Sequence, residues 1–90
     1  MTNEQCALVT GGSRGLGRAL VVWLVHEGWS VIVDARDPAD LVNATAALPR
    51  VHGVAGDVAD PVHRARLVEL AELGGGLDLV VNNASTLAVG

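Results

Sequence analysis

The sequence predicts a doubly wound α/β fold built on a parallel sheet. Short apolar runs alternate with longer amphipathic stretches along all 90 residues. The connections between them are short, as in parallel strands joined by right-handed helical crossovers. The apolar runs are rich in Val and Leu, which is typical of strands covered on both faces. We therefore expect one compact domain over residues 1–90, with about four strands and three helices.

The first half of the chain is expected to form strand, helix, strand and helix, over residues 7–9, 14–27, 30–34 and 39–48. The first helix has apolar residues at i, i+4, i+7 and i+8, a spacing that predicts one buried face; they are Leu16, Leu20, Trp23 and Leu24. Gly28 is expected to close this helix in a left-handed conformation. Asp37 and Pro38 would be the cap and first residue of the second helix, which Pro49 would end.

The second half is expected to form strand, helix and strand. The third strand covers residues 51–55, and Asp60 and Pro61 open a helix that runs to Leu73 and ends at three glycines. The fourth strand covers residues 77–81. Because it would be an uncovered apolar edge, we expect the chain to self-associate through it.

Charge and composition exclude several classes of partner. Six arginines and no lysine stand against ten acidic residues, and the arginines are scattered, so a nucleic-acid partner is not expected. The longest apolar run, residues 19–25, is too short to span a membrane, and the beginning of the chain lacks the pattern of a signal peptide. We expect a cytoplasmic location. The single cysteine and three separated histidines predict no metal site.

The glycine-rich stretch TGGSRGLG, residues 10–17, lies between the first strand and the first helix. Glycine there allows a ligand to approach the backbone, and the amides at the start of a helix attract an anion such as a pyrophosphate. A plain tight turn is the alternative. The P-loop pattern fails because Arg18 and Ala19 replace its Lys and Ser or Thr, and the GxGxxG pattern fails at Leu20. TGxxxGxG remains.

With this motif the chain resembles the short-chain dehydrogenase/reductase family, whose TGxxxGxG binds NAD(H) or NADP(H). Two more family motifs follow in order: AGDV at residues 55–58 and VNNA at residues 81–84, although Ser85 replaces the glycine of the family's NNAG. The resemblance covers residues 5–90 and implies a Rossmann-type fold. It implies twelve cofactor-binding residues: Thr10, Gly11, Ser13, Arg14, Gly15, Leu16, Gly17, Arg36, Asp57, Val58, Asn83 and Ala84.

The resemblance implies an oxidoreductase that transfers hydride between a nicotinamide and a carbonyl or alcohol carbon. In the family a tyrosine is the general acid/base, and a lysine lowers its pKa. This sequence has neither, since the family's Ser and YxxxK lie beyond the fourth strand. We therefore assign no catalytic residue. The chain is either the cofactor-binding part of such an enzyme or a non-catalytic fragment that needs a partner chain. His26, His52 and His63 are expected to be surface or packing residues away from the glycine loop.

The end of the second strand bears on the choice of cofactor. An acid there binds the ribose hydroxyls of NAD, whereas arginine accommodates the 2′-phosphate of NADP. Asp34 is a candidate ribose acid that would repel a phosphate. Residues 35–37, Ala-Arg-Asp, resemble NADP-dependent carbonyl reductases, and Arg14 adds a second cation. The sequence favours NADP(H), with NAD(H) as the alternative.

Overall fold

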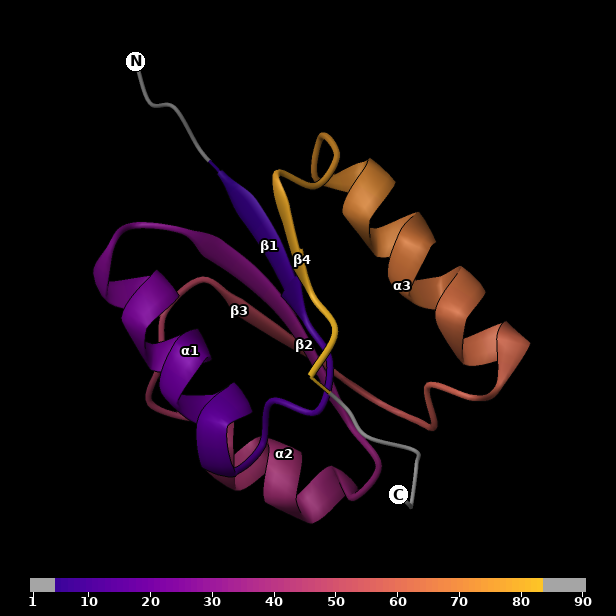
Figure 1. The fold of residues 1–90 in the computed structure, drawn as a ribbon, viewed down its shortest axis with the longest axis horizontal. Helices are drawn as coiled ribbons and strands as arrows, with labels where there is room; N and C mark the ends of the chain where they lie inside the picture. Colours follow the sequence, from indigo (N-terminus) through magenta and orange to yellow (C-terminus); the bar gives the residue numbers. More distant parts are fainter. Residues whose placement is uncertain (1–4, 84–90) are drawn as a thin grey trace.

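The computed structural model describes residues 5–83, which form a four-stranded parallel sheet and three helices (Figure 1). The elements, in chain order, are β1 (Cys6–Val9), α1 (Gly15–His26), β2 (Ser30–Ala35), α2 (Pro38–Thr45), β3 (Val51–Ala55), α3 (Pro61–Leu73) and β4 (Leu79–Val81). The order of the strands in the sheet is β3-β2-β1-β4. This order and the parallel pairing confirm the predicted α/β class.

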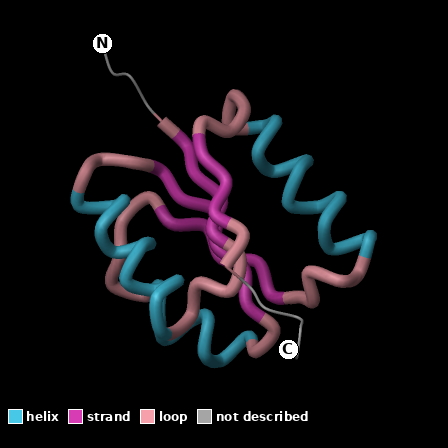
Figure 2. Tube along the Cα trace, in the orientation of Figure 1, coloured by secondary structure: helices cyan, strands magenta, loops and turns pink. Residues whose placement is uncertain are grey.

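The sheet lies between two layers of helices. Figures 1 and 2 show α1 and α2 on one side of the sheet and α3 on the other, which is the doubly wound arrangement. Side chains of β1 alternate between the two cores: Ala7 and Val9 pack on the α1 side, whereas Cys6 and Leu8 pack with Leu67 of α3. The same alternation in β2 fixes which face each of its residues reaches.

Burial of the strands decreases from the centre of the sheet to its edges. All residues of β1 and all but the first of β2 are buried, as expected for strands covered on both faces. The expectation is wrong for β3 and β4, in which most residues are exposed. Each of these strands has a neighbour on one side only among the described strands, and three helices do not cover the whole sheet.

The buried face of α1 differs from the predicted one. Leu16 is 70% exposed and Trp23 is 57% exposed, whereas the buried residues are Gly17, Val21, Leu24 and Val25. The helix is rotated by about one residue because Gly17 must lie against the backbone of Gly11. In α3 the predicted apolar residue Leu73 is likewise 80% exposed.

The ends of the helices follow the predicted chemistry. The Asp37 carboxylate accepts hydrogen bonds from the amides of Ala39 and Asp40, and Asp60 accepts one from Val62. Gly28 has a φ of 91°, so it closes α1 in the left-handed region. Helix α2 ends at Thr45, before the predicted end at residue 48. None of the helices described is both long and apolar enough to cross a membrane.

The exposed edge strand gives the first testable prediction. Leu79 and Val80 of β4 are 38% and 56% exposed, and one edge of β4 has no partner among the strands of residues 5–83. We expect the chain to self-associate at high concentration and Val80→Lys to reduce this, because a charge on an edge strand opposes pairing. Light scattering measures the effect, and Val42→Lys on the exposed face of α2 is the control. A parent chain that stays monomeric would contradict the prediction.

Candidate functional site

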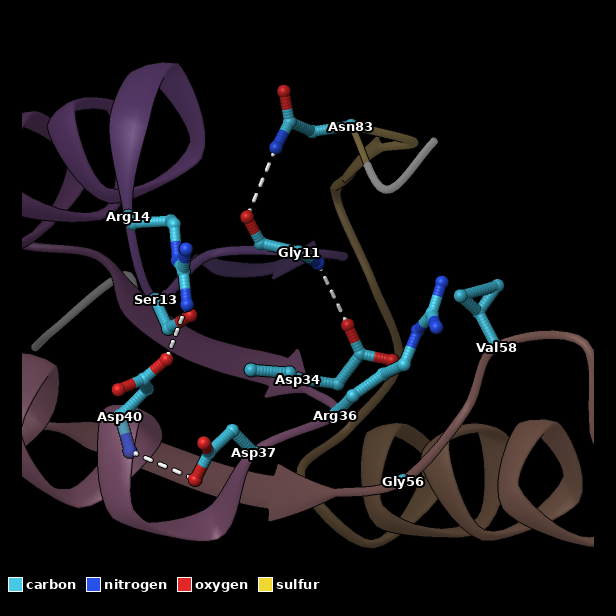
Figure 3. Close-up of a pocket in the computed structure, with 11 residues that line it drawn as sticks. Gly11, Ser13, Arg14, Asp34, Arg36, Asp37, Asp40, Gly56, Val58 and Asn83 are labelled. Carbon is cyan, nitrogen blue, oxygen red and sulfur yellow. Dashed lines mark hydrogen bonds and ion pairs between the residues drawn. The ribbon is translucent and has the colours of Figure 1, made fainter. Parts of the chain in front are cut away.

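The candidate site lies where the carboxyl ends of the parallel strands meet. The chain passes from β1 to β2 through α1 on one face and from β3 to β4 through α3 on the other, so the order of strands reverses next to β1. Ligands of open α/β sheets bind at such a point. A cavity of about 330 Å³ lies there (Figure 3), lined by Gly11, Ser13, Arg14, Asp34, Ala35, Arg36, Asp37, Asp40, Gly56, Val58 and Asn83.

The amides of the glycine loop divide into two groups. The Gly11 amide donates to Asp34 Oδ1 at 2.8 Å, and the Gly12 amide donates to the Asp34 carbonyl at 3.0 Å. These two amides are therefore used within the protein. The amides of residues 13–17 have no hydrogen-bond acceptor in the described part of the chain. They form the amino end of α1, where the helix dipole also favours an anion.

Gly15, the first residue of α1, has open space where a side chain would be. It has a φ of 61°, and a Cβ added to it would have no atom within 4 Å. A left-handed backbone and an absent side chain are what a close approach of a ligand to main chain requires. The loop therefore fits a diphosphate group, since it combines several amides that have no acceptor in the described part of the chain with a position at Gly15 that no neighbouring atom occupies.

Gly17 has a different role, in packing. A Cβ at this position would lie 2.3 Å from the Gly11 carbonyl oxygen and 2.5 Å from Asn83 Nδ2. The Asn83 amide group donates to the same Gly11 oxygen at 2.9 Å (Figure 3). Gly17 thus allows α1, the loop after β1 and the segment after β4 to meet.

Several other residues implied by the resemblance do not line the cavity. Thr10 is buried, and its single hydroxyl proton lies within reach of both Val81 O, at 3.4 Å, and Asn82 Oδ1, at 3.3 Å, so it ties β1 to the end of β4. Leu16 is exposed, and the Asp57 carboxylate accepts from the Ala59 amide. Gly15 and Gly17 are also absent from the lining. Ala84 lies outside the described residues. The roles of all these residues stay predictions.

Two arginines stand at the rim with different partners. Arg14 Nη2 forms an ion pair with Asp40 Oδ2 at 2.5 Å. Arg36 is exposed and has no hydrogen-bond or ion-pair partner among residues 5–83. Figure 3 shows the Arg36 side chain directed away from Asp37 and Asp40, toward the side on which Val58 lies. Of these two arginines, Arg36 is therefore the one available to bind an anionic group.

Five lining residues are not among the twelve that the resemblance implies, although the sequence suggests Asp34 as a ribose acid and residues 35–37 as a guide to the cofactor: Asp34, Ala35, Asp37, Asp40 and Gly56. Four of them lie at the ends of β2 and β3 or directly after them, and Asp40 is in the first turn of α2. Because parallel strands end at one edge of the sheet, the carboxyl ends of neighbouring strands were the signal that could have found them.

One histidine is closer to the glycine loop than expected. His63 Nε2 lies 2.7 Å from Asp34 Oδ2, and the other oxygen of the same carboxylate accepts from the Gly11 amide. The expectation that no histidine lies near the loop is therefore wrong. The cause is the alternation of β2, which directs Asp34 to the α3 face. His63 is nevertheless a buried packing residue, and His26 and His52 are exposed, as expected.

Comparisons with known proteins agree with this geometry. The family model described as short chain dehydrogenase matches residues 5–90. A rhamnolipid-biosynthesis 3-oxoacyl-acyl-carrier-protein reductase of Pseudomonas aeruginosa is 38% identical over 84 residues, which cover 89% of this chain and 33% of that protein.

Two solved structures share the fold. L-sorbose reductase from Gluconobacter frateurii, in complex with NADPH and L-sorbose, has a TM-score of 0.85 and 36% identity, over 92% of this chain and 34% of that one. RhlG of Pseudomonas aeruginosa, in a complex with NADP, has a TM-score of 0.79 and 35% identity, over 91% and 34%. The chain spans about a third of the length of these relatives. Matched over nearly all of its residues, the chain belongs to the short-chain dehydrogenase family.

Proposed function

We propose that this chain binds a nicotinamide dinucleotide at the carboxyl edge of its sheet, as the cofactor-binding part of an oxidoreductase. The observation that carries the proposal is the row of amides at residues 13–17, which have no acceptor in the described structure and lie at the amino end of α1, where the position of Gly15 is free of neighbouring atoms. A helix amino end of this kind binds phosphate groups. The family membership supports the dinucleotide as the source of the phosphates.

Different lining residues would contact different parts of the dinucleotide. The amides of the loop would hold the diphosphate, Val58 and Asn83 would contact the adenosine part, and Arg36 would meet a 2′-phosphate. When bound, the nicotinamide supplies or accepts the hydride. The part played by the chain is to bind and orient the cofactor, since Asn83 and Gly17 fix the loop against the end of β4.

Proton transfer is the step for which the chain offers no group. The sequence has no Tyr, and its six basic residues other than histidine are all arginines, which stay protonated. His63 is engaged with Asp34. We therefore propose that the acid/base group comes from another part of a longer protein.

A second candidate function is that of a non-catalytic binding piece completed by a partner chain. The exposed residues of β4 favour it, because a further strand could pair there. The coding sequence downstream of Gly90 discriminates the two, since an in-frame Tyr-x-x-x-Lys supports the oxidoreductase. A cytoplasmic location and the lack of nucleic-acid or membrane partners stay predictions from the sequence.

We favour NADP(H) over NAD(H). Arg36 is exposed at the rim without a partner among the described residues, and a guanidinium binds phosphate through paired hydrogen bonds. Two structural neighbours were solved with NADPH or NADP. Asp34, which would repel a 2′-phosphate, is 1% exposed and paired with His63. Against this choice stand Asp37 and Asp40 on the same rim.

Calorimetric titration of the chain with NADPH and with NADH tests both parts of the proposal. We expect Arg36→Ala to weaken NADPH binding about tenfold, since one charge-assisted contact is lost. Binding of NADH should change less than about twofold, because that nucleotide has no 2′-phosphate. Arg66→Ala, an exposed arginine of α3 outside the cavity, is the matched control. Absence of heat with either nucleotide would refute the function, and equal losses for both would refute the role of Arg36.

A further inference from the structure

A buried pair of side chains connects the candidate site to α3. Asp34 is 1% exposed and His63 is 6% exposed. Asp34 Oδ2 lies 2.7 Å from His63 Nε2. Asp34 also lines the cavity, so its carboxylate lies beside the proposed cofactor site. The pair comes from β2 and the first turn of α3.

The pair depends on local features of both elements. Ile32 of β2 packs with the α3 core, and Asp34 two residues later points to the same face. Gly56 makes room for the imidazole, since a Cβ there would lie 2.1 Å from His63 Nδ1. A larger residue at position 56 would displace the ring. The absence of a side chain at Gly56 therefore leaves the space that the His63 ring fills opposite the Asp34 carboxylate.

Both oxygens of Asp34 are occupied by this arrangement. Oδ1 accepts from the Gly11 amide at 2.8 Å, and an ionised carboxylate only accepts, so His63 donates to Oδ2 through Nε2–H. An acid at the end of the second strand of a dinucleotide-binding fold ordinarily binds the ribose hydroxyls. Here both oxygens of the carboxylate already accept from protein donors, so it is not free to accept from ribose hydroxyls.

We propose that His63 is a positioning residue for cofactor selection, which holds the Asp34 carboxylate on the α3 face and so leaves the ribose side to Arg36 and NADPH. This inference rests on the proposed nucleotide binding and deepens it. Without His63, the carboxylate would be buried with one donor only. An unpaired buried charge is costly, and Asp34 borders the cavity. The Asp34 carboxylate would therefore turn toward the water in that cavity. It would then repel a 2′-phosphate and accept from ribose hydroxyls.

The test is the ratio of the dissociation constants for NADH and NADPH, measured by calorimetry on the full chain and its variants. We expect His63→Leu to lower this ratio about tenfold, because a released carboxylate opposes the 2′-phosphate. His63→Gln retains a donor for Oδ2 and should keep the ratio of the parent. The double variant Asp34→Asn with His63→Leu has no charge to release, and it should also keep that ratio. A merely structural role would weaken both nucleotides equally and leave the ratio unchanged in every variant.

Asp34→Asn alone tests the premise of the inference if His63→Leu does not fold, because it shows whether the Asp34 charge acts on the 2′-phosphate while His63 is present. The substitution removes the charge but keeps the shape, so we expect both affinities to shift together and the ratio to stay within about twofold. A rise in NADPH preference of about fivefold or more would mean that Asp34 already acts on the 2′-phosphate despite His63, and would overturn the inference. A parent chain that binds neither nucleotide refutes the proposed function. A parent chain that binds both, with a ratio indifferent to His63→Leu, refutes the inference alone.

Discussion

Gly17→Ala is expected to lower the free energy of unfolding of the chain by about 3 kcal/mol, at the upper end of what overpacking usually costs. The added Cβ would lie 2.3 Å from the Gly11 carbonyl oxygen, and that oxygen is held by Asn83. Neither backbone can move without breaking the contacts between α1, the loop after β1 and the segment after β4. Chemical denaturation followed by circular dichroism measures the loss.

Gly74→Ala is the matched control for this substitution. Gly74 ends α3 with a φ of −89°, and an added Cβ would approach no atom closer than 3.7 Å. We expect no loss of stability there, since the new side chain neither collides nor strains the backbone. If Gly17→Ala unfolds at the same denaturant concentration as the parent and as Gly74→Ala, the close approach of the loop to α1 is wrong.

Gly15→Val is expected to weaken NADPH binding about a hundredfold while the fold remains, which corresponds to the loss of two charge-assisted hydrogen bonds. The added side chain would fill open space at the first residue of α1, where we propose that the diphosphate approaches the backbone. A valine with positive φ is also strained, at a cost of roughly 1–2 kcal/mol. Calorimetry measures the binding and denaturation measures the strain.

Gly28→Val separates these two effects. Gly28 also has a positive φ, 91°, and an added Cβ would likewise have no atom within 4 Å, but it lies at the other end of α1. The two variants should lose similar stability, and only Gly15→Val should lose NADPH binding. Equal binding by both variants would show that the space over the loop is not where the nucleotide lies.

Local signals predicted most of the fold. Apolar runs and their glycine and proline boundaries located all four strands, and Asp37-Pro38 and Asp60-Pro61 located the starts of two helices because capping depends on a few adjacent residues. The buried face of α1 was not predicted. Spacing alone favoured Leu16 and Trp23, but the face is set by the contact of Gly17 with Gly11, and glycine carries no hydropathy signal.

Six of the twelve residues that the motifs imply lie around one cavity, and their roles in binding stay predictions. Gly11, Ser13, Arg14, Arg36, Val58 and Asn83 line the cavity. The buried partnership of Asp34 with His63 was not predicted, since the two residues come from different elements and meet only across one face of the sheet. The alternation of β2 side chains between the two faces of the sheet could be read from the sequence. The packing of α3 that brings the His63 imidazole to Asp34 is a property of the tertiary structure, so local signals could not predict it.

The central claim is that the amides at the amino end of α1 receive the diphosphate of a nicotinamide dinucleotide. The most direct measurement is a titration of the ¹⁵N-labelled chain with NADPH, followed amide by amide in NMR spectra. We expect the largest changes at Ser13, Leu16 and Gly17, and none at Gly74. Changes confined to the cavity at the amino ends of the strands, lined by Cys6 and Arg50 among others, or no change in the loop at saturating NADPH, would contradict the claim.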